Sequence, residues 1–148
     1  MKKLLIFLIL IILFVSSSYA QERTSPFSAA KVVGENKATI KTLANDVRDN
    51  TMLIKEKIQL LSDNNVEIST EQLETLKNYA VLITDQQEAM KATLGQINAY
   101  TDDILIARQV KDFDALFILY NEIIKIQTTR IHQLTEYNQL LDDLFDTL

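Results

Sequence analysis

Apolar side chains recur every three or four residues along most of this chain, the spacing of a helix face. The repeat is strictest in the first half, where five residues stand seven positions apart: Val33, Ile40, Val47, Ile54 and Leu61. No stretch alternates apolar and polar residues as a strand does, and the 148 residues include only two glycines and one proline. The spacing predicts an all-α fold, an elongated antiparallel three-helix bundle with coiled-coil-like contacts.

Capping signals divide the chain into helices expected at about residues 26–61, 70–110 and 113–147. Ser25 and Pro26 begin the first, since serine caps a helix and proline is tolerated at the first helical position. Ser69 begins the second, and Gln72 three residues later completes a capping box. Each of these starts is therefore predicted from local residue chemistry.

The second and third helices are expected to meet in a tight hairpin near residues 109–112. Asp112 can cap the third helix, and Asp114 then lies in its first turn, facing the positive end of the helix dipole. The alternative is one continuous helix of nearly eighty residues, which is far longer than helices of globular proteins usually are.

Two polar residues interrupt the apolar seam of the second helix, Gln87 and Thr101. They can fix the register across a helix interface, or they can lie at its solvated edge.

The segment SDNNVEISTEQLETL, which begins at Ser62, resembles a calcium-binding loop leading into a helix. Neither possible register works. With Ile68 at the hydrophobic position, Leu61 and Gln72 replace two required carboxylates; with Asp63 at the first position, Ile68 replaces the required glycine. The residues instead fit a polar turn followed by a capped helix, with Ile68 and Leu73 as a hydrophobic staple.

The first twenty residues have the pattern of a secretory signal peptide. Lys2 and Lys3 precede an apolar run, Leu4 to Val15, and small residues end at Ala20. Cleavage would leave residues 21–148 as a single helical-bundle domain, periplasmic or extracellular, with no stable membrane anchor. An uncleaved signal anchor is the alternative, although the run is short for a membrane span.

Charge and composition exclude several classes of function. The chain has 15 basic and 20 acidic residues, a net charge of −5 that becomes −7 when Lys2 and Lys3 leave with the signal peptide. Such an acidic chain is not expected to bind nucleic acid. There is no cysteine, and His132 is the only histidine, so neither a common zinc site nor a catalytic triad is expected. We expect no cofactor, no metal and no enzymatic activity.

The third helix carries two adjacent apolar stripes, a wide face that suits packing against two other helices or against a partner. The expected interaction surface comprises Phe117, Tyr120, Ile124 and Tyr137. The chain is predicted to be an exported, non-enzymatic protein of the bacterial envelope that acts by protein–protein contact or self-association. The alternative is a periplasmic binding module for a small ligand or a divalent cation.

Overall fold

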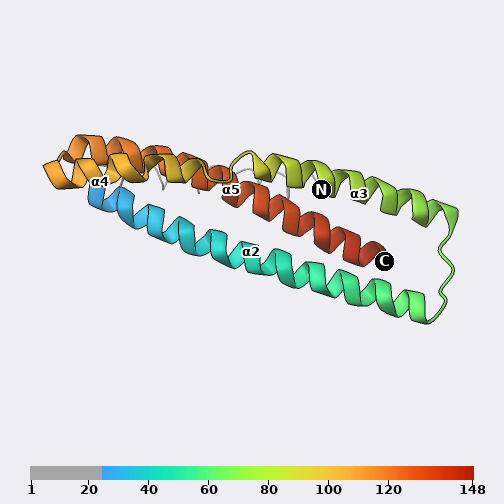
Figure 1. The fold of residues 1–148 in the computed structure, drawn as a ribbon. Coiled ribbons are helices and arrows are strands. Elements are labelled where there is room, and N and C mark those ends of the chain that lie inside the picture. Colours follow the sequence, from blue (N-terminus) through green and yellow to red (C-terminus); the bar gives the residue numbers. More distant parts are fainter. Residues whose placement is uncertain (1–24) are drawn as a thin grey trace, which may run out of the picture.

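The computed structural model describes residues 25–148, and the predicted signal peptide lies outside these residues. They form an all-helical bundle (Figure 1), as the apolar spacing predicted. Its elements are α2 (Pro26–Asp63), α3 (Thr70–Lys91), the 3-10 helix η1 (Gln96–Tyr100), α4 (Thr101–Val110) and α5 (Phe113–Thr147). None of the helices in this described part is both long and apolar enough to cross a membrane.

The helix starts confirm the capping predictions. The Ser25 hydroxyl accepts a hydrogen bond from the third residue of α2, and Pro26 is its first residue. At α3 the capping box is complete: the Gln72 backbone N–H donates to Ser69 Oγ at 3.1 Å, and the Ser69 backbone N–H donates to Gln72 Oε1 at 3.0 Å. Asp112 Oδ1 accepts from the Ala115 N–H at 2.9 Å and begins α5.

A two-residue hairpin separates α4 from α5, which excludes one continuous helix. Lys111 ends α4 in the left-handed conformation, with φ 58°. The Asp112 N–H then donates to the carbonyl oxygen of Ala107 at 2.9 Å, so the chain reverses within one turn.

The predicted continuous helix over 70–110 is wrong, because the segment is broken in its middle. The helix α3 ends at Lys91, and Gly95 adopts a φ of 79° before η1 and α4 resume the direction of the chain. A left-handed conformation is accessible to glycine without steric cost. The heptad spacing continues across this break, so the apolar pattern alone does not reveal it.

Side chains of α5 stabilise the end of α3 at the break. Arg130 Nη1 donates to the carbonyl oxygen of Met90 at 2.8 Å, and Gln133 Nε2 donates to that of Ala89 at 3.0 Å. Thr93 Oγ1 donates in turn to Gln133 Oε1 at 3.0 Å. The Met90 carbonyl oxygen also accepts from the Thr93 N–H at 3.3 Å, so local and tertiary donors together satisfy the last carbonyl groups of α3.

The long helix α5 occupies the centre of the bundle (Figure 1). The helix α2 packs along one side of it and runs parallel to it, while α3 packs on another side and runs antiparallel. Within residues 25–148, no Cα atom of α2 lies within 8 Å of one in α3. The helices α2 and α5 therefore form the main packed pair, whereas α2 and α3, which are consecutive in the sequence, do not contact each other.

Two apolar clusters hold this arrangement together. The cluster near α4 contains Ala29, Ala107, Leu116, Tyr120 and Ile124. The cluster near the α2–α3 loop contains Ile54, Met90, Leu134, Tyr137 and Leu141. The predicted heptad stripe of α2 packs against these clusters through Val33, Ile40, Val47 and Ile54. Ile54 is buried and Val33, Ile40 and Val47 are half-buried, so this stripe contributes apolar contact to the bundle.

Amide side chains of α5 reach across this interface to the backbone of α2. Gln127 Nε2 donates to the carbonyl oxygen of Val33, and Asn138 Nδ2 donates to that of Leu43, each at 3.0 Å. Asn50 Nδ2 donates to Asn138 Oδ1 at 3.3 Å. Polar groups within an apolar seam favour the one register in which they find partners.

Candidate functional site

The expected interaction surface is not exposed. Tyr120, Ile124 and Tyr137 are buried in the two clusters, and Phe117 is half-buried against the first of them. The exposed side chain of Gln87 donates to Tyr137 Oη at 2.8 Å, so this polar member of the α3 seam ties α3 to α5. The four apolar side chains stabilise the bundle because α2 and the α3–α4 segment cover both stripes of α5, and the contact surface must be sought elsewhere.

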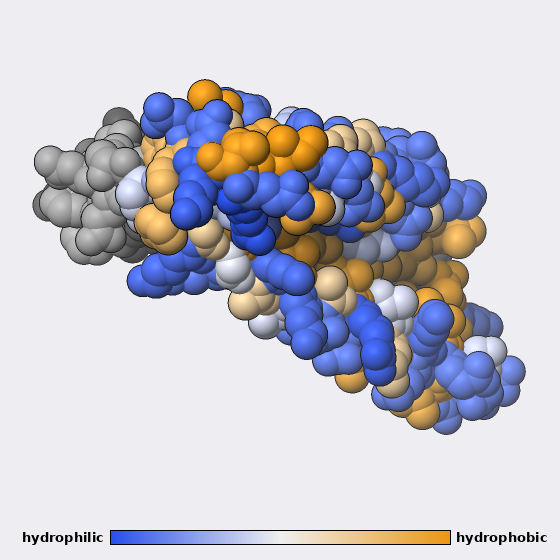
Figure 2. Space-filling view, turned by 60° about the vertical axis from the view of Figure 1, so that its left-hand side comes forward, coloured by the Kyte–Doolittle hydropathy of each residue, from blue (hydrophilic) through white to orange (hydrophobic). Residues whose placement is uncertain are grey.

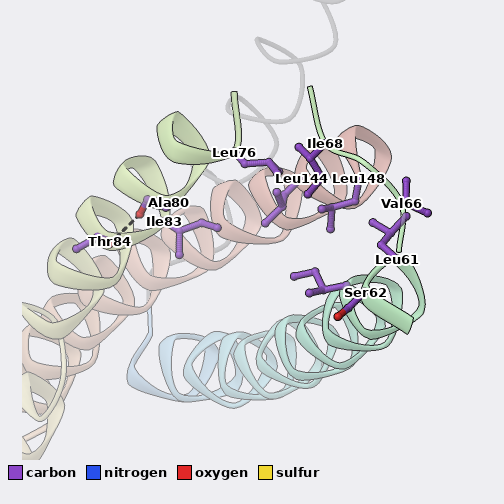
Figure 3. A pocket seen from close by; sticks show the side chains of 11 residues that line it. Leu61, Ser62, Val66, Ile68, Leu76, Ala80, Ile83, Thr84, Leu144 and Leu148 are labelled. Carbon is purple, nitrogen blue, oxygen red and sulfur yellow. Dashed lines mark hydrogen bonds between the residues drawn. The ribbon is translucent and has the colours of Figure 1, made fainter. Parts of the chain in front are cut away.

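A concave, mainly apolar feature of the described residues lies at the end of the bundle that carries the α2–α3 loop (Figure 3). We call it the open-end cleft. It has a volume of about 670 Å³ and is lined by Ile58, Leu61, Ser62, Val66, Ile68, Leu76, Ala80, Ile83, Thr84, Leu144 and Leu148. These residues come from α2, the connecting loop, α3 and α5.

The loop over residues 64–69 holds the two walls of the cleft apart. Its first turn is closed by the Val66 N–H, which donates to the carbonyl oxygen of Leu61 at 3.0 Å, and Asn65 adopts a φ of 50°. The loop then runs across to the capping box of α3 (Figure 1). Because α2 and α3 do not contact each other, no helix covers the apolar side chains that lie between them.

The lining of the cleft is apolar and open to solvent. Ile58, Val66 and Ile68 each expose 50% of their surface. The only polar side chains of the lining are Ser62 and Thr84, and the Thr84 hydroxyl donates to the carbonyl oxygen of Ala80 at 2.8 Å. No side chain of its lining is a carboxylate, an imidazole or an amine, so the cleft is equipped for apolar contact and not for acid–base chemistry.

Exposed charges of both signs lie near the cleft, since Asp63, Glu67, Glu71 and Glu74 are exposed as well as basic residues of both helices. Lys41, Arg48 and Lys55 precede Ser62 at successive seven-residue intervals on α2, and Lys77 precedes Thr84 by seven on α3. Residues seven apart lie on nearly the same side of a helix, so Lys55 and Lys77 lie on the helix sides that carry Ser62 and Thr84, two turns away from them. All four are exposed, and among residues 25–148 none forms an ion pair within 4.0 Å.

The opposite end of the bundle carries a second exposed apolar feature, the hairpin surface. It consists of Leu105, Ile106, Val110, Phe113 and Ile118, each more than half exposed, on α4 and the first turns of α5. A shallow groove of about 350 Å³ between these helices includes Asp103 and Asp112 beside apolar residues. Figure 2, with this end turned forward, shows apolar side chains gathered on it.

The remaining candidates of the sequence are His132 and the segment that resembles a calcium-binding loop. His132 is exposed on α5, with its Nε2 3.2 Å from Glu136 Oε1. The segment that resembles a calcium loop forms the turn and capping box described above. In the part of the chain that the structure describes, no three acidic or histidine residues come together in a way that could hold a metal ion.

No protein-family model, curated protein or solved structure is significantly similar to this chain.

Proposed function

We propose that this protein is exported and acts without catalysis, by protein–protein contact in the bacterial envelope. The open-end cleft is the docking site, and its occupant is an apolar-faced helical segment of a protein. A structural, adhesin-like or secretion-accessory role follows from such an activity. The observation that carries the proposal is the half-exposed apolar lining between two helices that do not meet.

The lack of contact between α2 and α3 favours a helix as the occupant. Helices pack with their axes about 8–10 Å apart, and α5 already supplies the floor of the cleft through Leu144 and Leu148. A helix placed between α2 and α3 would contact all three and complete a four-helix arrangement. Docking of an amphipathic helix into an apolar groove is a common mode of peptide recognition.

The second candidate function is the binding of a small apolar ligand in the same cleft. Its volume lies within the range of about 300–1,000 Å³ that is usual for ligand sites. However, such sites bury about 70–90% of their ligand, and a lining as exposed as Ile58, Val66 and Ile68 gives little enclosure. A divalent cation is favoured less, because the cleft lining contains no carboxylate.

The chain offers a matched pair of positions for testing the docking site. Ile58 lines the cleft and is 50% exposed, while Leu60 is 61% exposed on α2 but does not line it. A photo-reactive amino acid is placed at either position in the full chain, expressed with its own leader. We expect discrete protein adducts from position 58 that are absent from position 60 and are lost when Leu76 in the cleft is changed to Glu. Equal adducts from both positions would contradict the proposal.

Native mass spectrometry of the purified protein distinguishes small-ligand binding from protein docking. A bound small molecule that disappears in Ile58→Glu, but persists in Leu60→Glu, would favour the ligand function over protein docking.

A further inference from the structure

The helix α3 is fastened to the rest of the bundle at one end only. The residues of α3 that are hydrogen-bonded to α5 all lie in its last turns: Gln86, Gln87, Ala89 and Met90. Met90 is also the buried residue of this helix. Within the described part of the chain, no hydrogen bond or ion pair joins residues 70–85 to another helix. The last turns therefore anchor α3, and the preceding turns form an arm.

The first turns of this arm extend past the end of α5. Gln87 lies level with Tyr137, to which it is bonded, and the two helices run antiparallel, so Leu76 lies level with Leu148 at the end of α5. Residues 70–75 thus have no part of α5 beneath them, and the start of α3 projects beyond the C-terminus in Figure 1. No side chain of the arm is buried, and its contacts with the bundle are made by half-buried residues.

Both ends of α3 have connections that permit it to change its direction. Every residue of the loop over 64–69 is exposed, and connections of about 2–8 residues are usual between helices packed side by side. At the other end Gly95 separates α3 from η1, so a rotation of α3 need not turn α4. A rotation of about 20° about Gln86 would move the first residue of α3 by about 8 Å, at 1.5 Å per residue.

Closure of the arm would remove apolar surface from water. Ile58 and Leu61 line the cleft on α2, and Leu76 and Ile83 line it on α3, with no helix between them. Their burial against each other is favourable. The charges near the cleft oppose closure, because its exposed acidic residues outnumber its exposed basic ones: Glu56, Asp63, Glu67, Glu71 and Glu74 against Lys55 and Lys77. Salt, which screens exposed charges, should therefore favour closure.

We infer that α3 is a hinged arm that pivots about its anchored last turns and closes the open-end cleft against α2. In the closed arrangement Leu76 lies against Leu61, and the cleft is filled by the walls themselves. A partner that docks in the cleft then competes with this closure, so the arm regulates access to the site. The pivoting itself does not depend on the proposed docking function.

Engineered cysteines test the closure directly, because the chain has none of its own. The test pair is Leu61→Cys with Leu76→Cys, both in the cleft lining. No Cα atom of α2 lies within 8 Å of one in α3, whereas a disulfide needs Cα atoms about 4.4–6.8 Å apart, so an intrachain bond requires the arm to move. The control pair is Leu60→Cys with Val81→Cys, exposed positions on the same two helices outside the cleft.

Both variants are oxidised with copper phenanthroline at low protein concentration, and mass spectrometry separates intrachain from interchain bonds. The test pair should form its intrachain disulfide at least about tenfold faster than the control pair, and faster still in high salt. Equal rates, or no intrachain bond in the test pair, would overturn the inference. Circular dichroism should show the same helix content before and after oxidation. A loss of helix would mean that α3 unfolds to make the bond, which would also contradict a pivoting arm.

A photo-reactive amino acid at position 58 of the test pair separates this inference from the proposed function. Oxidation should remove the protein adducts of position 58, and reduction should restore them, whereas adducts that persist in the oxidised chain would overturn the regulatory role. If the disulfide forms but the wild-type chain gives no adduct at position 58, the arm closes and the docking function fails. If adducts form but the disulfide does not, the docking function stands and the hinged arm fails.

Discussion

Arg130 Nη1 of α5 donates to the main-chain carbonyl oxygen of Met90, 2.8 Å away, in the last turn of α3. Desolvation lowers the pKa of Arg130 from its usual value, but a guanidinium stays charged at neutral pH. A cation is therefore held at the negative end of the α3 dipole. The break in the middle of the chain is thus stabilised by a residue nearly forty positions later in the sequence.

Replacing this cation should weaken the bundle. Arg130→Met removes a charge-assisted donor and leaves the Met90 carbonyl without it, so the free energy of unfolding should fall by about 1–2 kcal/mol. Urea unfolding followed by circular dichroism measures the change. Lys125→Met removes the same charge from an exposed pair with Glu122 and should cost less than about 0.5 kcal/mol. Equal losses in the two variants would show that the contact with Met90 is not stabilising.

The buried amide of Gln127 should be replaceable without loss of stability. Only 3% of this residue is exposed, and its Oε1 has no hydrogen-bond partner among the described residues, while Nε2 donates to the Val33 carbonyl. An unpartnered buried oxygen costs about 1–3 kcal/mol, which offsets the bond that Nε2 makes. Gln127→Leu should therefore leave the free energy of unfolding unchanged or raise it by about 1 kcal/mol.

Asn138 provides the contrasting case on the same helix. Both ends of its amide are bonded, to the Leu43 carbonyl and to Asn50. Asn138→Leu should lower the free energy of unfolding by about 1 kcal/mol. A larger loss for Gln127→Leu than for Asn138→Leu would mean that the Gln127 oxygen has a partner in solution, such as water.

The two glycines should respond in opposite directions to substitution by alanine. Gly34 lies within α2, where a Cβ atom would meet nothing within 4 Å, so Gly34→Ala should raise the free energy of unfolding by about 1 kcal/mol. Gly95 also has free space around it, but its φ is 79°. Gly95→Ala should lower the free energy by about 1–2 kcal/mol through backbone strain alone. Thermal unfolding of the two variants checks this, and stabilisation by both would contradict the observed break.

The interaction between the exposed residues Glu88 and Lys91 should depend on pH. A hydrogen bond from Lys91 Nζ, 2.7 Å from Glu88 Oε1, and the nearby positive charge lower the pKa of Glu88 below its ordinary value of 4.5. Because the folded-state pKa is the lower one, the stabilising effect is present above the unfolded-state pKa and is lost as the pH falls through the folded-state pKa. NMR titration should show that Lys91→Gln raises the pKa of Glu88, whereas Lys77→Gln does not. An unchanged value in Lys91→Gln would exclude the ion pair in solution.

Local chemistry made several features of the fold predictable. The capping side chains of Ser25, Ser69 and Asp112 bind backbone N–H groups only three residues away, so the sequence near each position is enough to predict the helix start. The break after Lys91 was missed because its stabilising groups, Arg130 and Gln133, come from another helix. Gly95 is the local residue that indicates the break, but the heptad spacing of apolar residues continues past it and favours an unbroken helix.

The candidate site was less accessible to prediction than the fold. The aromatic and aliphatic residues of α5 suggested a surface, but Tyr120 and Tyr137 are buried by helices on two sides. The useful local signals were Val66 and Ile68, apolar residues within an otherwise polar turn, which prove to line the open-end cleft.

Periodicity and capping in the sequence alone determined that this chain is helical, where its long helices begin and which stripe of α2 is buried, because these properties depend on residues a few positions apart. Only the tertiary structure decided that α5 is the central helix, that α2 packs on it in parallel, and that α2 and α3 leave an apolar cleft between them. Those features depend on which apolar faces find each other across long sequence separations, and an amphipathic stripe does not specify its partner.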